Sequence, residues 1–346
     1  MINLYGVEIS KLEDQMVALG QKKFRATQLY TWIYEKRATS FDEMSDVSLR
    51  FREELKTQYN LTTLPIYFQQ NSSDGTVKFL LELHDGHKIE TVLMRYNYGN
   101  VVCVTSQVGC NMGCSFCASG LLKKQRNLTA AEMVGQIMVV KELLLKEGNG
   151  QRVTHVVVMG TGEPFDNYDN VLDFVRIINH PKAFSIGARH ITVSTCGIPD
   201  KIRQYADEGL QINLAISLHA PNNEIRSSIM KINQAYPLEV LMPAIKYYEA
   251  KAGRRVTFEY ILLAGVNDRI QDADELSDLI RGTLAYVNLI PYNEVSEHGY
   301  KRSPEPAVRA FLARLTKRGI TATVRKEFGA DIDAACGQLR AKKERL

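Results

Sequence analysis

The stretch VVCVTSQVGCNMGCSFC, residues 101–117, joins an apolar segment to three closely spaced cysteines. Its first part, VVCVTS, predicts a buried β-strand, and the loop after it carries Cys110, Cys114 and Cys117 with the spacing C-x3-C-x2-C. A structural zinc ion takes four ligands, and no fourth Cys or His lies nearby in the sequence. A four-iron cluster held by three thiolates keeps one iron free, which the amino and carboxylate groups of S-adenosylmethionine can chelate. The stretch therefore predicts a [4Fe-4S] cluster, shielded by Phe116, that works with S-adenosylmethionine.

Strands and helices alternate along the rest of the chain. Short apolar runs predict the strands, and periodic apolar spacing predicts the helices between them. The predicted strands are 101–106, 153–159, 190–195, 212–217, 255–262, 285–290 and 320–325, and the predicted helices are 129–147, 168–179, 199–208, 238–252, 270–281 and 305–318. This alternation indicates a parallel sheet, and the number of repeats favours a full or partial β/α barrel over an open doubly wound sheet. We therefore expect an α/β protein built on a partial (β/α) barrel.

The N-terminal part has a different pattern. FRATQLYTWIYEKR (24–37) and DVSLRFREELKTQY (46–59) carry apolar residues at helical spacing, and TVKFLLEL (76–83) and KIETVLMRY (88–96) predict a hairpin. The aromatic residues of the first helix are expected to form the core of this module; they are Tyr30, Trp32 and Tyr34. The expected division is a mainly helical accessory domain at 1–85, a connecting strand and linker carrying Glu90 at 86–100, a core at 101–335 and a C-terminal segment at 336–346.

Composition excludes several classes of protein. The 346 residues are 45% hydrophobic, which is enough for a large core, and no segment approaches the roughly 18 unbroken apolar residues of a membrane helix. The N-terminal residues have neither a basic start nor an apolar run, so no signal peptide is expected. We expect a soluble cytoplasmic protein with no membrane contact. The net charge of +4 does not identify a nucleic-acid binder, although local clusters such as Lys22, Lys23 and Arg25 could contact phosphates.

Polar or glycine-rich residues follow several of the predicted strands. MGTGEP (159–164) follows the second core strand, Ser194 ends the third, Ser217-Leu218-His219 ends the fourth, and Asn293 follows the sixth. Ligand sites of β/α barrels gather at this end of the strands. Gly160 and Gly162 would let the backbone approach a ligand, and Glu163 could accept hydrogen bonds from an ammonium group or a ribose. As a set, these loops predict a cofactor cleft.

Six segments resemble the RlmN family of radical S-adenosylmethionine methyltransferases, which modify adenine in ribosomal and transfer RNA. They are CVTSQVGCNMGCSFCASG (103–120), MGTGEPFDN (159–167), RHITVSTCG (189–197), ISLHAPN (216–222), VNLIPYN (287–293) and DIDAACGQLR (331–340). The resemblance extends from FRATQLY (24–30) to the C-terminal CGQLR (336–340), essentially the whole chain. It implies a partial barrel of the radical S-adenosylmethionine type, one [4Fe-4S] cluster and two S-adenosylmethionine molecules per turnover.

The resemblance also implies roles for individual residues. Cys336 looks like the residue that is methylated on sulfur, and Cys103 is similar to the thiol that later forms a transient disulfide with it. Glu90 lies where the family has a carboxylate that removes the proton of the base. The residues that align with the family's S-adenosylmethionine contacts are Gly162, Glu163, Ser194, Ser217, Leu218, His219 and Asn293. From the residues alone, Glu90 could be a solvated carboxylate, and Cys103, Cys196 and Cys336 could be small buried hydrophobic residues.

The implied reaction is methylation of carbon 2 of adenosine 2503 in 23S ribosomal RNA and of adenosine 37 in certain transfer RNAs. Implied partners are these RNAs and an electron donor such as flavodoxin, and a monomer is expected. Carbon 2 lies between two ring nitrogens and is a poor nucleophile, so a radical route is chemically reasonable.

Three alternatives stay open. A Cfr-type relative uses the same two thiols but methylates carbon 8, and the Phe328-Gly329 step looks somewhat like that relative. Another radical enzyme, such as a glycyl-radical activase, would leave Cys336 unmethylated. A zinc-bearing RNA-binding protein without catalysis would contain zinc in place of iron.

Overall fold

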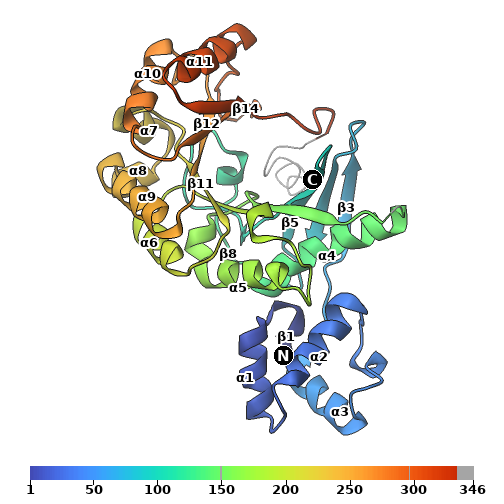
Figure 1. The fold of residues 1–346 in the computed structure, drawn as a ribbon. Helices are drawn as coiled ribbons and strands as arrows, with labels where there is room; N and C mark the ends of the chain where they lie inside the picture. Colours follow the sequence, from blue (N-terminus) through green and yellow to red (C-terminus); the bar gives the residue numbers. More distant parts are fainter. Residues whose placement is uncertain (149, 296, 333–346) are drawn as a thin grey trace.

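A computed structural model describes residues 1–148, 150–295 and 297–332. Its N-terminal part is a small helical module that lies apart from the large sheet (Figure 1). The module contains α1 (Ile9–Ala18), α2 (Phe24–Tyr30) with a π-helical turn (Thr31–Glu35), α3 (Leu49–Gln58), and the short parallel strands β1 (Ile2–Asn3) and β2 (Tyr59–Asn60). Tyr30, Trp32 and Tyr34 are buried, which confirms that these aromatic residues form the core of the module.

A ten-stranded sheet forms the rest of the framework, in the order β14-β13-β12-β11-β10-β9-β6-β5-β4-β3. Strands β6 and β9 to β14 run parallel, while β3, β4 and β5 continue the sheet in antiparallel fashion. The bounds are β3 (Ile66–Asn71), β4 (Val77–Glu82), β5 (Lys88–Tyr96), β6 (Gly99–Cys103), β9 (Val153–Val158), β10 (Ile191–Thr195), β11 (Asn213–Ser217), β12 (Thr257–Leu262), β13 (Tyr286–Pro291) and β14 (Thr321–Val324). The sheet therefore crosses the domain boundary that we expected near residue 85.

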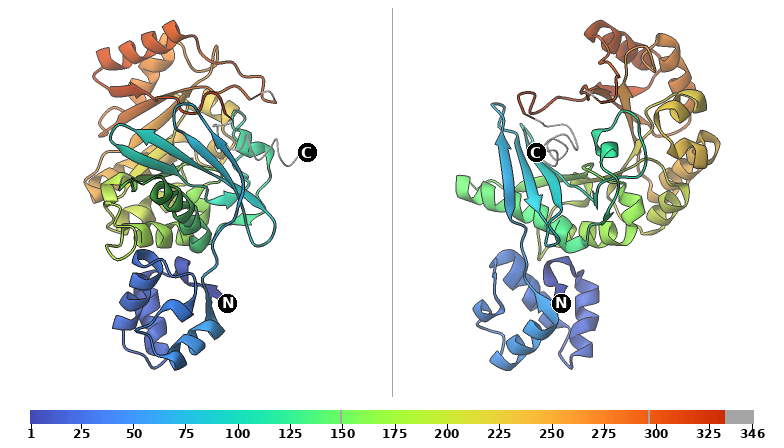
Figure 2. Two further views of the ribbon diagram at one scale, coloured as in Figure 1. Left: turned by 90° about the vertical axis from the view of Figure 1, so that its right-hand side faces the viewer. Right: turned by 180° about the vertical axis from the view of Figure 1, so that it is seen from behind.

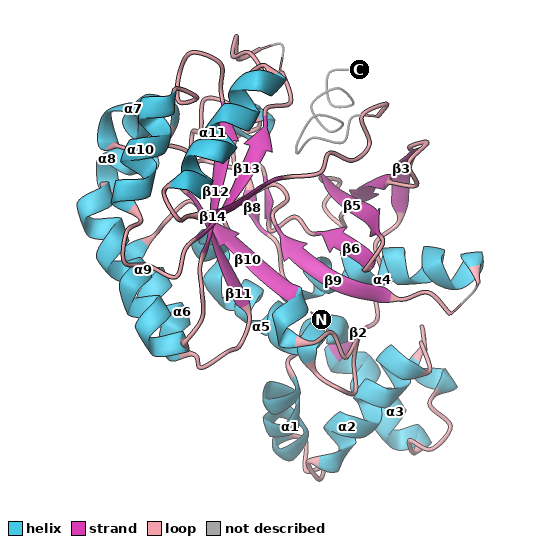
Figure 3. Cartoon of the chain, turned by 45° about the horizontal axis from the view of Figure 1, so that its top comes forward, coloured by secondary structure: helices cyan, strands magenta, loops and turns pink. Residues whose placement is uncertain are grey.

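Helices follow the parallel strands and cover the convex side of the curved sheet (Figure 3). They are α4 (Ala130–Glu147), α5 (Tyr168–Asn179), α6 (Pro199–Asp207), α7 (Asn223–Ile229), α8 (Ile232–Ala235), α9 (Leu238–Ala252), α10 (Ile270–Leu279) and α11 (Glu305–Lys317). Two short strands, β7 (Gln107–Val108) and β8 (Arg126–Asn127), pair within the loop between β6 and α4. The predicted partial (β/α) barrel is confirmed. Among the residues with described coordinates, no helix is long and apolar enough to cross a bilayer.

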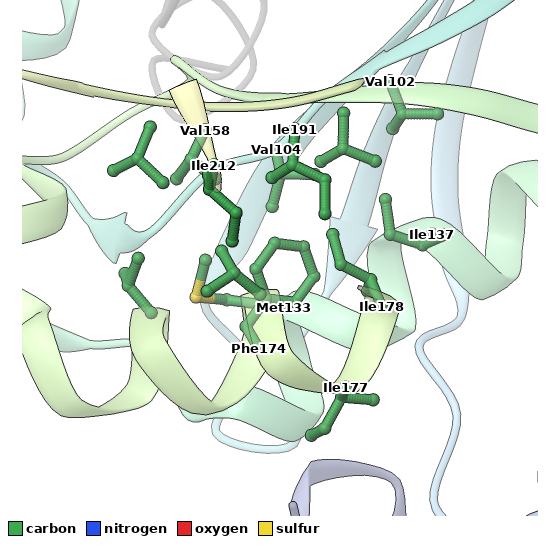
Figure 4. Packing of buried hydrophobic residues seen from close by; sticks show 14 of the residues in the cluster. Val102, Val104, Met133, Ile137, Val158, Phe174, Ile177, Ile178, Ile191 and Ile212 are labelled. Carbon is green, nitrogen blue, oxygen red and sulfur yellow. The ribbon is translucent and has the colours of Figure 1, made fainter. Parts of the chain in front are cut away.

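The two faces of the parallel strands differ in chemistry. Val102, Val158 and Ile191 point outward and pack with Phe174 of α5 in the core between sheet and helices (Figure 4). Because side chains alternate along a strand, the residues between them point inward. The inward face of the central strands carries Ser194, Ser217, Glu259 and Asn288. The helices therefore cover an apolar surface, whereas the inside of the barrel combines these polar residues with apolar ones such as Val157 and Ile261.

The chain after β14 crosses the open side of the barrel toward the turn between β3 and β4 (Figures 1 and 2). The Gly329 N–H donates to Asp74 Oδ2 at 2.8 Å, and the Ser73 N–H donates to Asp331 Oδ2 at 3.0 Å. The Ser72 hydroxyl donates to Asp331 Oδ1. We call residues 325–331 the strap, because they join the β14 edge of the sheet to the far hairpin.

Candidate active site

The three clustered cysteines lie in the loop between β6 and α4. The Cys110 N–H donates to the Leu122 carbonyl at 3.0 Å, and the Ser115 N–H donates to the Ile229 carbonyl at 2.9 Å. Gly109 has φ +81°, and a Cβ there would lie 2.2 Å from the carbonyl oxygen of Lys123. Only glycine fits this turn, so local backbone contacts fix the path of the loop.

The three cysteines of this loop are partly exposed. Burial raises the pKa of Cys110 to about 11 and also raises the pKa of Cys114, so as thiols they are protonated at neutral pH. Metal binding would displace these protons. In the part of the chain that the structure describes, no three His, Cys, Asp or Glu side chains converge as ligands of a single ion. Thiolates of a four-iron cluster each bind a different iron, so this donor set fits a cluster.

Phe116 and His219 form a buried aromatic contact beside the cysteines. Their ring centroids are 5.0 Å apart at an interplanar angle of 82°. His219 has φ +60°, and its Nδ1 accepts the Ile261 N–H at 3.1 Å. Burial lowers the pKa of His219 to about 3, so the ring is neutral and carries its proton on Nε2. The contact places Phe116, which is predicted to shield the cluster, next to His219, which is expected to contact S-adenosylmethionine.

The expected S-adenosylmethionine residues all lie at the carboxyl ends of the parallel strands. Gly162 follows β9, and Asn293 follows β13. Ser194 is the last but one residue of β10, and Ser217 is the last residue of β11. The hydroxyl oxygens of Ser194 and Ser217 are 3.5 Å apart. Gly162 has φ +114°, and a Cβ there would lie 2.7 Å from Cβ of Gln107. The structure therefore brings these residues to one edge of the sheet, and their contact with S-adenosylmethionine stays a prediction.

Glu163 has structural contacts in addition to its expected role. Its carboxylate accepts the Phe165 N–H at 3.0 Å and the Cys196 N–H at 2.7 Å, and the side chain is buried. Burial raises its pKa. Glu163 thus connects the loop after β9 to the end of β10. Cys196, for which the sequence indicated no chemical role, is itself buried.

A cavity of about 360 Å³ lies inside the barrel. Cys117 of the cluster loop, Cys103 at the end of β6 and Asn293 all line it. Most of the remaining lining is apolar and comes from β5, β6, β9, β12 and β13; it includes Val92, Met94, Val101, Val157, Ile261 and Ile290. The predicted resolving thiol therefore shares a cavity with a predicted cluster ligand.

Glu90 lies on the same face of β5 as Val92, which lines the cavity. Its Oε2 is 2.9 Å from Nζ of Lys78, and the two side chains are 5% and 0% exposed. Glu90 is therefore buried, and the alternative of a solvated carboxylate is wrong. Lys78 was missed by the sequence analysis, although a single lysine in the apolar run VKFLLEL is a usable signal.

Cys336 lies outside the described residues. The last described residue is Ile332, which directly follows the strap. Four strap residues line the cavity that contains Cys103; they are Arg325, Lys326, Glu327 and Phe328.

Two further buried charges were not predicted. Arg226 of α7 is 0% exposed and donates to the carbonyl oxygens of Cys196 at 2.6 Å and Leu218 at 3.2 Å. It thereby connects the ends of β10 and β11, and nothing in the sequence around it indicates this. Glu259 of β12 accepts from Asn288 at 2.9 Å and lies 3.4 Å from Arg325 of the strap. An acidic residue within the apolar strand RVTFEYIL was the available signal.

Comparison with known proteins identifies the family. The Radical SAM superfamily matches residues 104–277, and the ribosomal RNA large subunit methyltransferase N-terminal domain matches residues 2–61. A probable dual-specificity RNA methyltransferase RlmN from Enterococcus faecalis is 58% identical over 344 residues, covering 99% of this chain and 96% of the relative. The protein of the same name from Geobacillus kaustophilus is 55% identical over 343 residues, covering 99% and 93%.

A solved structure agrees with this result. A radical SAM methyltransferase from Sphaerobacter thermophilus has a TM-score of 0.90 and 43% identity, covering 98% of this chain and 99% of that one. The superfamily match also implies the predicted cofactors, a [4Fe-4S] cluster and S-adenosylmethionine. These comparisons are consistent with the geometry of the cysteine loop and the cavity. The chain therefore belongs to the RlmN family of dual-specificity radical S-adenosylmethionine RNA methyltransferases.

Proposed function

We propose that this chain methylates carbon 2 of adenosine 2503 in 23S ribosomal RNA and of adenosine 37 in certain transfer RNAs. The methyl group would pass through an S-methyl group on Cys336, and Cys103 would release the product by forming a transient disulfide. The observation that carries the proposal is the cavity that Cys103 and Cys117 both line. A thiol on the barrel wall, in the same cavity as a cluster ligand, supports a role for Cys103 in the reaction.

The cluster would be held by Cys110, Cys114 and Cys117, and when bound it supplies the electron that cleaves S-adenosylmethionine. The Cys336 thiolate would first take a methyl group from one S-adenosylmethionine molecule. Transfer of a hydrogen atom from this methyl group to the adenosyl fragment of a second S-adenosylmethionine would then leave a carbon radical on Cys336 that adds to carbon 2 of the adenine. The adduct would also lose one electron, which the cluster could accept.

Two residues would complete the transfer. Glu90 would accept the proton that carbon 2 loses, and its place beside Val92 on the inward face of β5 supports this role. The Cys103 thiolate would attack the Cys336 sulfur, which breaks the bond between that sulfur and the transferred carbon and forms the disulfide. The released carbon would keep the electron pair of that bond and take up a proton to become the methyl group. A reductant for the disulfide and an electron donor such as flavodoxin would be needed for another turnover.

The mostly apolar lining of the cavity suits a base that has left its stack. RNA enzymes reach a base by extruding it or by binding an unpaired loop. An extruded adenine needs apolar contact on its faces, which Val92, Met94 and Ile261 could provide. We propose that the protein acts as a monomer in the cytoplasm.

The test is nucleoside mass spectrometry on RNA treated with the cluster-loaded protein. The proposal expects 2-methyladenosine, and an 8-methyl product would show Cfr-type chemistry instead. Cys103→Ala should accumulate RNA crosslinked through Cys336, because the resolving thiol is missing. Cys196→Ala is the matched control, since Cys196 is buried behind the Glu163 loop and should resolve the crosslink normally. A Cys103→Ala protein that cleaves S-adenosylmethionine and forms no crosslink would refute the two-thiol assignment.

A further inference from the structure

Five aromatic rings form a continuous row from the cavity to the protein surface. The consecutive centroid distances are 4.4 Å from Phe328 to Tyr96, 4.6 Å from Tyr96 to Tyr98, 5.1 Å from Tyr98 to His155 and 4.2 Å from His155 to His190. The first three of these rings line the cavity. We call the five residues the stacking row.

The stacking row lies at the opposite end of the barrel from the cluster loop. Tyr98 occupies the turn between β5 and β6, His155 is near the start of β9, and His190 directly precedes β10. The cysteines, by contrast, follow the carboxyl end of β6. The cavity therefore has predicted redox chemistry at one end and a group of aromatic rings at the other.

Two rings of the row are exposed to solvent. Tyr98 is 58% exposed although it stacks on Tyr96 at an interplanar angle of 25°. His190 is exposed and stacks on His155 at 22°. Burial lowers the pKa of His155, which favours the neutral imidazole at physiological pH. An exposed tyrosine on a pre-stacked partner adds little to the core, but it offers a rigid flat surface to a planar ligand.

Cations accompany the row. Arg152 precedes β9, Arg189 is adjacent to His190, and Lys326 has its Nζ 4.9 Å from the Phe328 centroid. All three side chains are exposed, and within the described ranges none of them forms an ion pair. The neighbouring carboxylate, Glu327, is paired with Arg302. Positive charge beside aromatic faces is the combination that binds single-stranded nucleic acid.

We propose that the stacking row binds unpaired RNA bases adjacent to the target adenosine, with Arg152 and Arg189 contacting the phosphates. This inference rests on the proposed function, because it assumes that the target base enters the cavity. A base that leaves its stack deprives its neighbours of a stacking partner. The exposed faces of Tyr98 and His190 would replace that partner outside the cavity.

Binding of a labelled RNA hairpin with an unpaired adenosine in its loop tests the proposal. Fluorescence anisotropy is measured with the cluster-loaded protein over a range of salt concentrations. We expect Tyr98→Ala to weaken binding about tenfold, which corresponds to about 1.4 kcal/mol, while Tyr98→Trp retains affinity because stacking is preserved. Replacing Arg152 and Arg189 together by Gln should reduce the slope of log Kd against log salt by about 0.7 for each phosphate that the variant no longer neutralises.

Arg203 and Tyr247 provide a matched control. They form a cation–π pair at 5.2 Å on the outer helices α6 and α9, away from the cavity. Tyr247→Ala and Arg203→Gln should bind RNA like the unchanged protein. The cluster absorption spectrum and reductive cleavage of S-adenosylmethionine should be unaltered in every variant, and the loss in Tyr98→Ala should appear in KM for RNA rather than in kcat.

The outcomes separate this inference from the proposed function. If the unchanged protein binds and methylates RNA but Tyr98→Ala and the double arginine variant bind equally well, the stacking row is refuted and the proposed function stands. If Tyr98→Ala weakens binding while no 2-methyladenosine forms with any RNA, the row is supported as an RNA site and the proposed function fails. If Tyr98→Ala loses its cluster, the salt slope of the double arginine variant decides the question alone.

Discussion

The buried Lys78–Glu90 pair gives the sharpest prediction about stability. Its Nζ and Oε2 atoms are 2.9 Å apart, and the side chains are 0% and 5% exposed. Lys78→Met removes this cation and leaves a buried carboxylate without it, which costs about 3–5 kcal/mol of unfolding free energy. Glu90→Gln should cost a similar amount, because it leaves the lysine buried without the charge that faces it. The double variant Lys78→Met/Glu90→Gln removes both charges. Its loss of unfolding free energy should therefore be about 3 kcal/mol smaller than the sum of the losses of the two single variants.

Urea unfolding of the four proteins under anaerobic conditions measures this coupling. The control is Lys56→Met, because Lys56 lies 2.7 Å from Asp42 in an ion pair on the surface of the N-terminal module. This exposed pair should contribute no measurable stability, although its distance is shorter. If the losses of the two single variants at Lys78 and Glu90 add within about 0.5 kcal/mol in the double variant, the reasoning from burial is refuted.

Three further predictions concern His219, Gly162 and the strap. The pKa of His219 is about 3 in the fold and about 6.5 in an unfolded chain, so below pH 6.5 only the unfolded state takes up the proton. From pH 7.5 to pH 5.5 the free energy of unfolding, measured in urea, should therefore fall by about 1.4 kcal/mol less for His219→Asn than for the unchanged protein. An equal fall in both proteins would refute the lowered pKa of His219. Gly162→Ala should weaken S-adenosylmethionine binding measured by calorimetry, whereas Gly148→Ala should not, since both glycines have positive φ but only Gly162 is crowded. Asp331→Ala removes the hydrogen bonds that Asp331 accepts from the Ser72 hydroxyl and the Ser73 N–H, so the backbone amides of the strap should exchange with deuterium faster. Unchanged exchange would show that these hydrogen bonds do not hold the strap.

The barrel could be predicted from the sequence because its strands are short apolar runs separated by periodic helices. The run RVTFEYIL (255–262) became β12 (Thr257–Leu262), and the helical pattern at 238–252 became α9 with the same bounds. Strand β3 (Ile66–Asn71) was not predicted, because IYFQQN shows no alternation of apolar and polar residues, is largely exposed and, among the described strands, pairs only with β4 at the edge of the sheet. Local pattern is sufficient where burial is periodic, and it fails at an edge strand that depends on its neighbour.

The site was predicted in part for the same reason. The cysteine loop has a local spacing that needs no tertiary information, and its residues were identified directly. Lys78 had a usable local signal as the one lysine of an apolar run, but its pairing with Glu90 depends on the register of β4 and β5. The contacts of Arg226 join different segments, and no pattern in a single segment indicates them. The partners of such buried charges can be identified only once the relative positions of the strands and helices are known.

The polar residues on the inward face of the central strands favour an open barrel. A closed β/α barrel fills its interior with layers of branched apolar side chains. Here Ser194, Ser217, Glu259 and Asn288 point inward, so closing the strands on one another would bury polar groups that need hydrogen-bond partners. In the open sheet these groups pair with one another and with the strap: Ser194 lies 3.5 Å from Ser217, and Glu259 accepts from Asn288 and lies 3.4 Å from Arg325. The alternation that places apolar residues under the helices therefore also places these polar groups on the cavity side, and one sequence pattern determines both faces of the sheet.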